Sequence, residues 1–276
     1  MAAEHRAYRV LITSSSTASY AESSPEQSEY ALLETYLHRE RPECDWRCAA
    51  EIIYLTASMP ERTVAAAKRH EADAVVLRLV GGFFFNEYVI ERIRQISPRL
   101  YRASRNVAQW WRDLAGGGPH GDDDARGWLY RFPRWLLIKT IGTAPRISVE
   151  DAIVAVTKTI DELLKLEDVH VLVRLPSYPK TRDTNLKEYE RRTTAFGTAI
   201  REHCERRRVP YYDWAGVRRR AQHERVIGDD RWHPTLDSRD FDVRTMAQAL
   251  VAAVGGPLTE MYLQPDVEIQ SHEPAV

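Results

Sequence analysis

The chain alternates short apolar runs with amphipathic helical patterns, and this alternation restricts its fold more than any other feature. Short apolar runs bounded by turn residues predict buried strands, and apolar spacings of three and four predict helices that cover them. Strands are expected at residues 8–12, 49–55, 74–80, 169–175 and 209–213. Helices are expected at about residues 27–39, 60–70, 186–204 and 238–254. This order predicts an α/β fold in which helices cover both faces of a central parallel sheet.

Residues 95–150 interrupt the alternation. They contain a glycine-rich acidic loop at 116–124 and an aromatic stretch at 128–138 (WLYRFPRWLLI). We therefore expect one α/β domain over residues 1–256 with a helical, aromatic insertion at about 95–150. Residues 257–276 hold several prolines and acids, and this composition is typical of a loosely attached C-terminal tail.

The charge and cysteine content disfavour several classes of partner. The net charge is −1, so no overall field attracts nucleic acid or an anionic membrane. No apolar stretch reaches the roughly 20 residues of a membrane span, and the N-terminal residues lack a signal-peptide pattern. Three cysteines, an odd number, fit reduced thiols, and none has the neighbours of a zinc site. We expect a cytoplasmic protein without a metal or organic cofactor.

The first strand is followed by Thr-Ser-Ser-Ser-Thr at 13–17. A serine at a strand-to-loop turn can present its hydroxyl to a substrate while nearby backbone N–H groups face a developing oxyanion. Serine and threonine are also common in ordinary polar turns. Taken alone, this segment leaves both interpretations open.

The third strand is followed by Gly-Gly-Phe-Phe-Phe-Asn-Glu at 81–87. The glycines permit close backbone approach, and the amide of Asn86 can donate to an oxyanion. The alternative for Asn86 is a cap on the next helix, and the alternative for the phenylalanines is the core.

Asp230 and His233 lie between the last strand and the last helix. A spacing of three lets the carboxylate orient the imidazole, which favours one tautomer and stabilises the imidazolium. Histidine titrates near neutral pH, as a general base must. The alternative is a helix cap followed by a surface histidine.

Together and in this order, the three segments resemble the SGNH/GDSL hydrolase superfamily. Residues 230–235 (DRWHPT), placed before the C-terminal helix, are similar to the last motif of that family. The resemblance covers about residues 8–92 and 165–254. It implies a flavodoxin-like three-layer α/β/α fold and ester hydrolysis through an acyl-enzyme, without a cofactor.

The resemblance also implies a catalytic triad. Ser15 corresponds to the nucleophile, His233 to the general base and Asp230 to the acid that orients it. Ser14 and Ser16 are adjacent alternatives for the nucleophile.

The implied oxyanion hole consists of the Asn86 amide, the backbone N–H of Ser15 and a backbone N–H after the second strand, for which we take Ser58 rather than its neighbour Ala57. The residues expected to contact the substrate are Ser14, Gly82 and Trp232.

Two departures from the family pattern leave rival functions open. Thr13 and Ser14 stand where the family has glycine and aspartate, and residues 56–59 (TASM) lack its second-motif glycine. We favour an esterase or deacetylase that acts on a small acylated substrate. The rivals are an acyltransferase on the same scaffold and a catalytically silent domain that binds a ligand or partner.

The insertion has its own alternatives. Its aromatic and apolar side chains either line an acyl pocket, form a lid hinged at 116–118, or pack against the sheet or a second subunit; we favour packing. Contact with a membrane surface is less favoured, and a homodimer would form through residues 95–150. The side chains concerned are Trp128, Tyr130, Phe132, Trp135 and Leu136.

Overall fold

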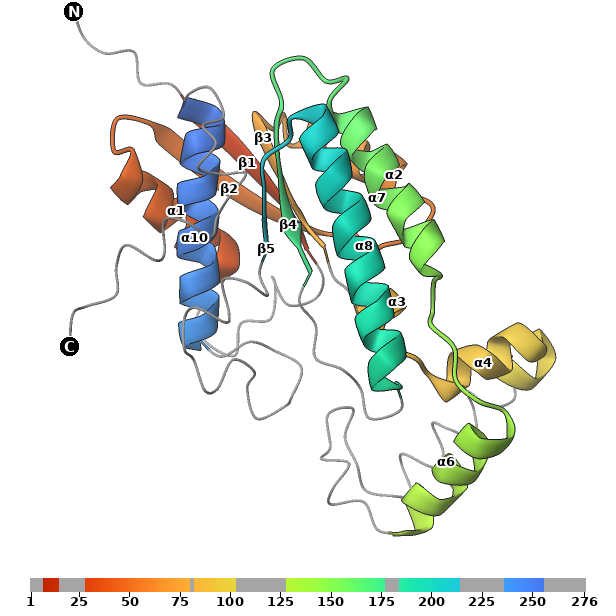
Figure 1. Ribbon diagram of the computed structural model, residues 1–276. Coiled ribbons are helices and arrows are strands. Elements are labelled where there is room, and N and C mark those ends of the chain that lie inside the picture. Colours follow the sequence, from red (N-terminus) through yellow and green to blue (C-terminus); the bar gives the residue numbers. More distant parts are fainter. Residues whose placement is uncertain are drawn as a thin grey trace, which may run out of the picture.

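The computed structural model describes residues 7–14, 28–79, 82–102, 128–176, 184–213 and 236–255 of the chain. Within these ranges, five parallel strands form one central sheet in the order β2-β1-β3-β4-β5 (Figure 1). This is the flavodoxin-like strand order, so the predicted fold class is confirmed. The strands are β1 (Ala7–Ser14), β2 (Asp45–Ile52), β3 (Ala74–Arg78), β4 (His170–Leu175) and β5 (Tyr211–Asp213).

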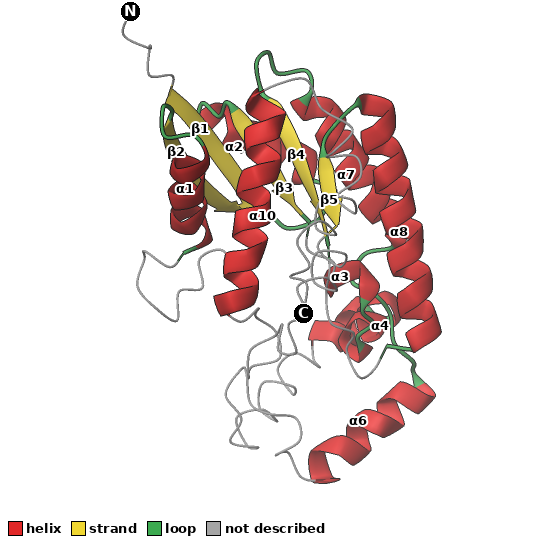
Figure 2. Cartoon of the chain, turned by 60° about the vertical axis from the view of Figure 1, so that its left-hand side comes forward, coloured by secondary structure: helices red, strands yellow, loops and turns green. Residues whose placement is uncertain are grey.

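Helices cover both faces of the sheet (Figures 1 and 2). One face packs against α1 and α10, and the other packs against α2, α7 and α8. None of the helices within the described ranges is long and apolar enough to cross a membrane. The helices are α1 (Glu29–Glu40), α2 (Met59–Arg69), α3 (Gly82–Phe85), α4 (Val89–Ile96), α6 (Trp128–Thr140), α7 (Val149–Leu163), α8 (Leu186–Arg207) and α10 (Leu236–Gly255).

The two apolar cores follow from the alternation of side chains along each strand. Leu11 of β1 packs in the core of α2, α7 and α8, whereas Val10 and Ile12 pack in the core of α1 and α10. All five residues of β3 are buried, because this strand lies in the middle of the sheet with helices on both sides. Near-continuous apolar runs are typical of such strands.

The second strand begins four residues earlier than the sequence predicts, at Asp45 instead of residue 49. Asp45 and Arg47 are charged and suggest a loop, but β2 is an edge strand and its charged side chains alternate with Trp46. Trp46 is buried and stacks on Tyr8 of β1, with the ring centroids 4.8 Å apart. The aromatic contact extends the strand into a charged segment.

The inserted segment is closed at its base by an antiparallel bridge. Tyr88 N–H donates to the Ala144 carbonyl at 2.8 Å, and Ala144 N–H donates to the Tyr88 carbonyl at 3.2 Å. Between these positions, α4 and α6 lie beyond the carboxyl ends of the strands (Figures 1 and 2).

Three of the insertion's aromatic and apolar side chains do not pack against the sheet, and their packing against a second subunit stays a prediction; the side chains of Trp128 and Tyr130 lie outside those that the structure describes. Phe132, Trp135 and Leu136 of α6 are 54%, 53% and 46% exposed. Helix α6 lies beyond the carboxyl ends of the strands, away from both cores. The rings of Phe132 and Trp135 instead stack on each other, with centroids 6.1 Å apart.

Helix α7 was not expected from the sequence, although it is the crossover between β3 and β4. Its first turn is capped by Ser148, whose hydroxyl accepts the N–H of Asp151 at 3.0 Å. We expect Ser148→Ala to lower the free energy of unfolding by about 1 kcal/mol, because one N–H at the start of α7 loses its partner. Urea denaturation measures this loss.

Ser28 is the matched control, since it precedes α1 in the same way but makes no cap hydrogen bond. Ser28→Ala should change the free energy of unfolding much less. Equal losses in the two variants would show that the Ser148 hydroxyl does not act as a cap.

Candidate functional site

The topology of the sheet marks one edge as the place for a site. From β1 the chain moves to β2 on one side, and it then returns through α2 to β3 on the other side of β1. In open parallel sheets, ligands bind outside the carboxyl ends of the strands at such a switch point. Here those ends are Ser14 of β1 and Arg78 of β3.

The predicted site residues within the described ranges lie at this edge. Ser14 is the last residue of β1, and Gly82 is the first residue of α3. Ser58 precedes α2 as its N-cap, and its hydroxyl lies 3.1 Å from that of Thr56.

The predicted triad lies outside the described residues, as does Trp232. Ser15 directly follows β1, and Asp230 and His233 shortly precede α10, which begins at Leu236. The roles of Ser15, Asp230 and His233 therefore stay predictions, although the elements that flank them are placed.

Asn86 follows α3 and is fully buried. The N-cap of α4 is Tyr88, so the alternative interpretation of Asn86 as a helix cap is wrong. Phe84 and Phe85, just before it, are buried in the core and pack on Phe196 of α8, with ring centroids 4.4 and 6.0 Å away. The core interpretation of these two phenylalanines is confirmed. Their packing fixes the backbone that carries Asn86.

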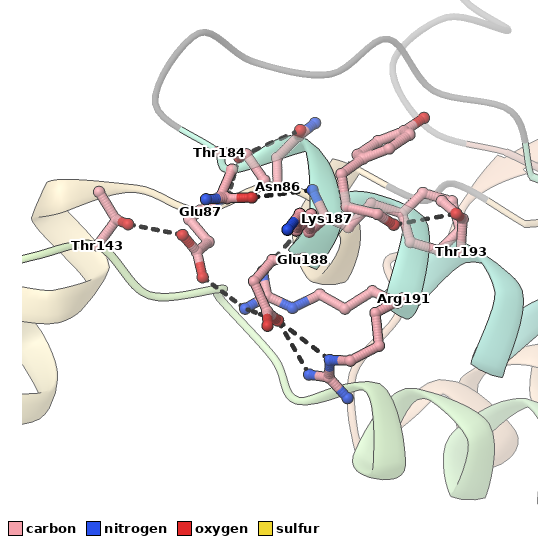
Figure 3. Close-up of polar contacts among 12 residues, drawn as sticks. Asn86, Glu87, Thr143, Thr184, Lys187, Glu188, Arg191 and Thr193 are labelled. Atoms are coloured by element: carbon pink, nitrogen blue, oxygen red, sulfur yellow. Dashed lines mark hydrogen bonds and ion pairs between the residues drawn. The ribbon is translucent and has the colours of Figure 1, made fainter.

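Thr184 contacts the side chain of Asn86 and the backbone after it (Figure 3). Its hydroxyl donates to Asn86 Oδ1 at 3.5 Å and accepts the N–H of Glu87 at 2.7 Å. Thr184 is buried and directly precedes Asn185, which caps α8 by accepting the N–H of Lys187 at 2.9 Å. The start of α8 thus holds the loop that contains Asn86.

Glu87 ties the same loop to the base of the insertion. Its carboxylate accepts the hydroxyl of Thr143 at 2.7 Å (Figure 3). The same carboxylate forms a mostly buried ion pair with Arg192 of α8. Arg192 also donates to the Phe85 carbonyl at 3.5 Å. The sequence gives no signal for Thr184, Glu87 or Arg192, because nothing in their local pattern distinguishes them from ordinary polar surface residues.

A group of buried charges lies directly under the carboxyl edge, and we call it the buried charge cluster. Arg78 and Arg174 are side by side in register on β3 and β4. Arg78 is paired with Glu29 of α1, and Arg174 is paired in a bidentate manner with Asp242 of α10, at 2.9 and 2.8 Å. The hydroxyl of Tyr212 donates to Asp242 at 3.2 Å.

Electrostatics within this cluster favour the charged form of Arg174. Burial by itself would lower the pKa of Arg174. The charge and hydrogen bond of Asp242, together with the nearby Tyr212 and Glu29, outweigh burial, and the pKa is raised. Burial, followed by the charge of Asp242, raises the pKa of Tyr212 well above its usual value. The cluster therefore anchors α1 and α10, the helices that follow the predicted nucleophile and the predicted general base along the chain.

A second aspartate–histidine pair lies at the opposite edge of the sheet. The carboxylate of Asp161 lies 3.1 Å from the imidazole of His203, and both residues belong to the ends of α7 and α8 that lead into β4 and β5. Burial raises the pKa of the Cys204 thiol to about 12, so this thiol is protonated at neutral pH. The described part of the chain contains no group of three or more side chains arranged to hold a metal ion.

Comparison with known proteins identifies similar folds but no similar sequence. No family model and no curated protein matches the chain. It is similar to the solved structure of LAE5, an α/β hydrolase from the metagenome of Lake Arreo, with 14% identity and a TM-score of 0.52 over 91% of this chain and 96% of that one.

It is also similar to a variant of Axe2, an acetyl-xylooligosaccharide esterase from Geobacillus stearothermophilus, with 12% identity and a TM-score of 0.50 over 91% of this chain and 96% of that one. Both likenesses extend over almost the whole chain, and they show that it has the fold of these hydrolases.

Proposed function

We propose that the chain is a serine-dependent ester hydrolase of the SGNH type, which acts through an acyl-enzyme on a small acylated substrate. One observation carries the proposal: the segments that bear Ser15, Asn86 and His233 are attached to elements that meet at one edge of the sheet. This edge includes the switch point, where α/β folds bind ligands.

The proposed reaction has two steps. The Ser15 hydroxyl attacks the ester carbonyl while its proton passes to His233, which Asp230 orients; the alcohol then leaves with that proton. A water molecule attacks the acyl-serine, His233 again removes and returns the proton, and the acid is released. The Asn86 amide and the backbone N–H groups of Ser15 and Ser58 stabilise the oxyanion in both steps.

Several features support this assignment. Asn86 is buried and fixed by the packing of α3 and α8, as a pre-organised oxyanion donor needs to be. A hydrolase and an esterase share the fold. One feature instead favours the rival function of a silent binding domain: Thr13 and Ser14 stand where the family motif has glycine and aspartate.

A fluorophosphonate probe and p-nitrophenyl acetate test the proposal together. We expect steady turnover of the ester and stoichiometric labelling by the probe, because the activated serine forms a stable adduct with phosphorus. Trypsin releases the expected nucleophile in the peptide 10–39, and fragmentation of that peptide should place the label on Ser15.

Absence of both turnover and labelling would favour the silent binding domain. Turnover with a label outside residues 13–17 would contradict the assigned nucleophile. Transfer of the acetyl group to an added alcohol in preference to water would favour the acyltransferase.

A further inference from the structure

We propose that Thr184 is a positioning residue, which turns the carboxamide of Asn86 so that its N–H donors face the oxyanion. This inference rests on the proposed function and extends it to a residue that the resemblance does not include. It arises from the contacts of Asn86 in the structure.

The carboxamide of asparagine has an acceptor on one side and donors on the other, so an oxyanion hole needs it in one of two orientations. The Thr184 hydroxyl donates to Oδ1 at 3.5 Å. In Figure 3 the amide nitrogen lies on the far side of the carboxamide from Thr184. A donor that contacts Oδ1 favours this orientation over the flipped one.

Thr184 is itself held in place from two directions. Its hydroxyl oxygen accepts the N–H of Glu87 at 2.7 Å. The proton of the Thr184 hydroxyl therefore points away from Glu87 and toward Asn86. Its backbone is fixed because the next residue, Asn185, caps α8. Both Thr184 and Asn86 are buried, so water does not compete readily for the hydrogen bond between them.

The contacts of Glu87 add a second restraint on the same loop. The carboxylate of Glu87 is shared between Thr143 at the base of the insertion and Arg192 of α8. The backbone on the C-terminal side of Asn86 is therefore anchored to two other segments, while Thr184 contacts its side chain. Pre-organised donors lower the activation barrier because they need no reorientation during the reaction.

The test uses three variants of the full chain with p-nitrophenyl acetate as substrate. Thr184→Val keeps the shape but removes the hydroxyl, and we expect kcat to fall roughly 10- to 100-fold with KM nearly unchanged. Thr184→Ser keeps the hydroxyl and should restore most of kcat. Thr193→Val is the matched control, since the Thr193 hydroxyl bonds only within α8, to the Tyr189 carbonyl at 3.0 Å and the Glu190 carbonyl.

A double-mutant cycle separates positioning from general stabilisation. In the Asn86→Ala background, Thr184→Val should change kcat by less than about twofold, because no carboxamide is left to orient. An equal loss in both backgrounds, or no loss in the wild-type background, would overturn the proposal.

The side-chain amide signals of Asn86 provide a readout that does not depend on turnover. In a ¹⁵N–¹H spectrum they are identified by their absence in Asn86→Ala, and we expect them to move in Thr184→Val but not in Thr193→Val. Unchanged signals would overturn the proposal. A wild type without turnover would remove the proposed function, and the spectrum would then still decide whether Thr184 orients Asn86.

Discussion

Ser15→Ala and His233→Ala are each expected to lower kcat for p-nitrophenyl acetate by about 10⁴- to 10⁶-fold. The serine supplies the electron pair that forms the acyl bond, and the histidine removes its proton, so each variant lacks a group that takes part in the reaction. Because the two act as one unit, the double variant should be no slower than either single variant within about threefold. Steady-state kinetics with a burst-phase measurement reports both results.

Two controls make this result specific. His203→Gln removes the histidine that lies 3.1 Å from Asp161 at the opposite edge of the sheet, and it should retain wild-type kcat. Ser16→Ala tests which serine is the nucleophile. If Ser16→Ala is inactive and Ser15→Ala is active, the nucleophile is Ser16. Retained activity in both Ser15→Ala and His233→Ala would contradict a serine-hydrolase mechanism.

The sequence predicts the fold well because the periodicity of apolar residues indicates which side chains are buried. The buried faces in turn determine how the helices pack on the sheet. The five predicted strands all exist, and the four predicted helices correspond to α1, α2, α8 and α10. Helix α7 was missed because residues 149–163 directly follow the expected insertion, whose unusual composition obscures where the scaffold resumes. Strand order does not follow from periodicity, since it depends on contacts between strands far apart in the chain.

The candidate site is only partly predictable for a related reason. Asn86 was found because it follows a strand and matches a family motif, whereas Thr184 lies 98 residues away and contacts it only in the folded chain. Arg78 and Arg174 did leave a signal in the sequence: each is a charged residue inside an otherwise apolar strand run. Such a residue in a buried strand requires an acidic partner, and here the partners are Glu29 and Asp242.

The buried charge cluster leads to the largest expected effect on stability. Asp242→Asn removes the carboxylate that pairs with Arg174 at 2.8 and 2.9 Å. The same carboxylate lies 3.9 Å from Arg78, so both adjacent guanidinium groups lose an acidic neighbour. Leaving a buried charge without its partner costs about 3–5 kcal/mol. We expect the free energy of unfolding, measured by urea denaturation, to fall by about this amount.

Two further variants show whether burial is the cause. Glu162→Gln removes a solvent-exposed ion pair with Lys165, at 2.7 Å, and should cost at most about 0.5 kcal/mol. The double variant Arg174→Met with Asp242→Leu removes both charges of one pair, so it should be more stable than Asp242→Asn, because an apolar pair leaves no unpaired charge at Arg174. If Asp242→Asn lowers the free energy of unfolding no more than Glu162→Gln does, water reaches the cluster. The anchoring of α1 and α10 to β3 and β4 would then need another explanation.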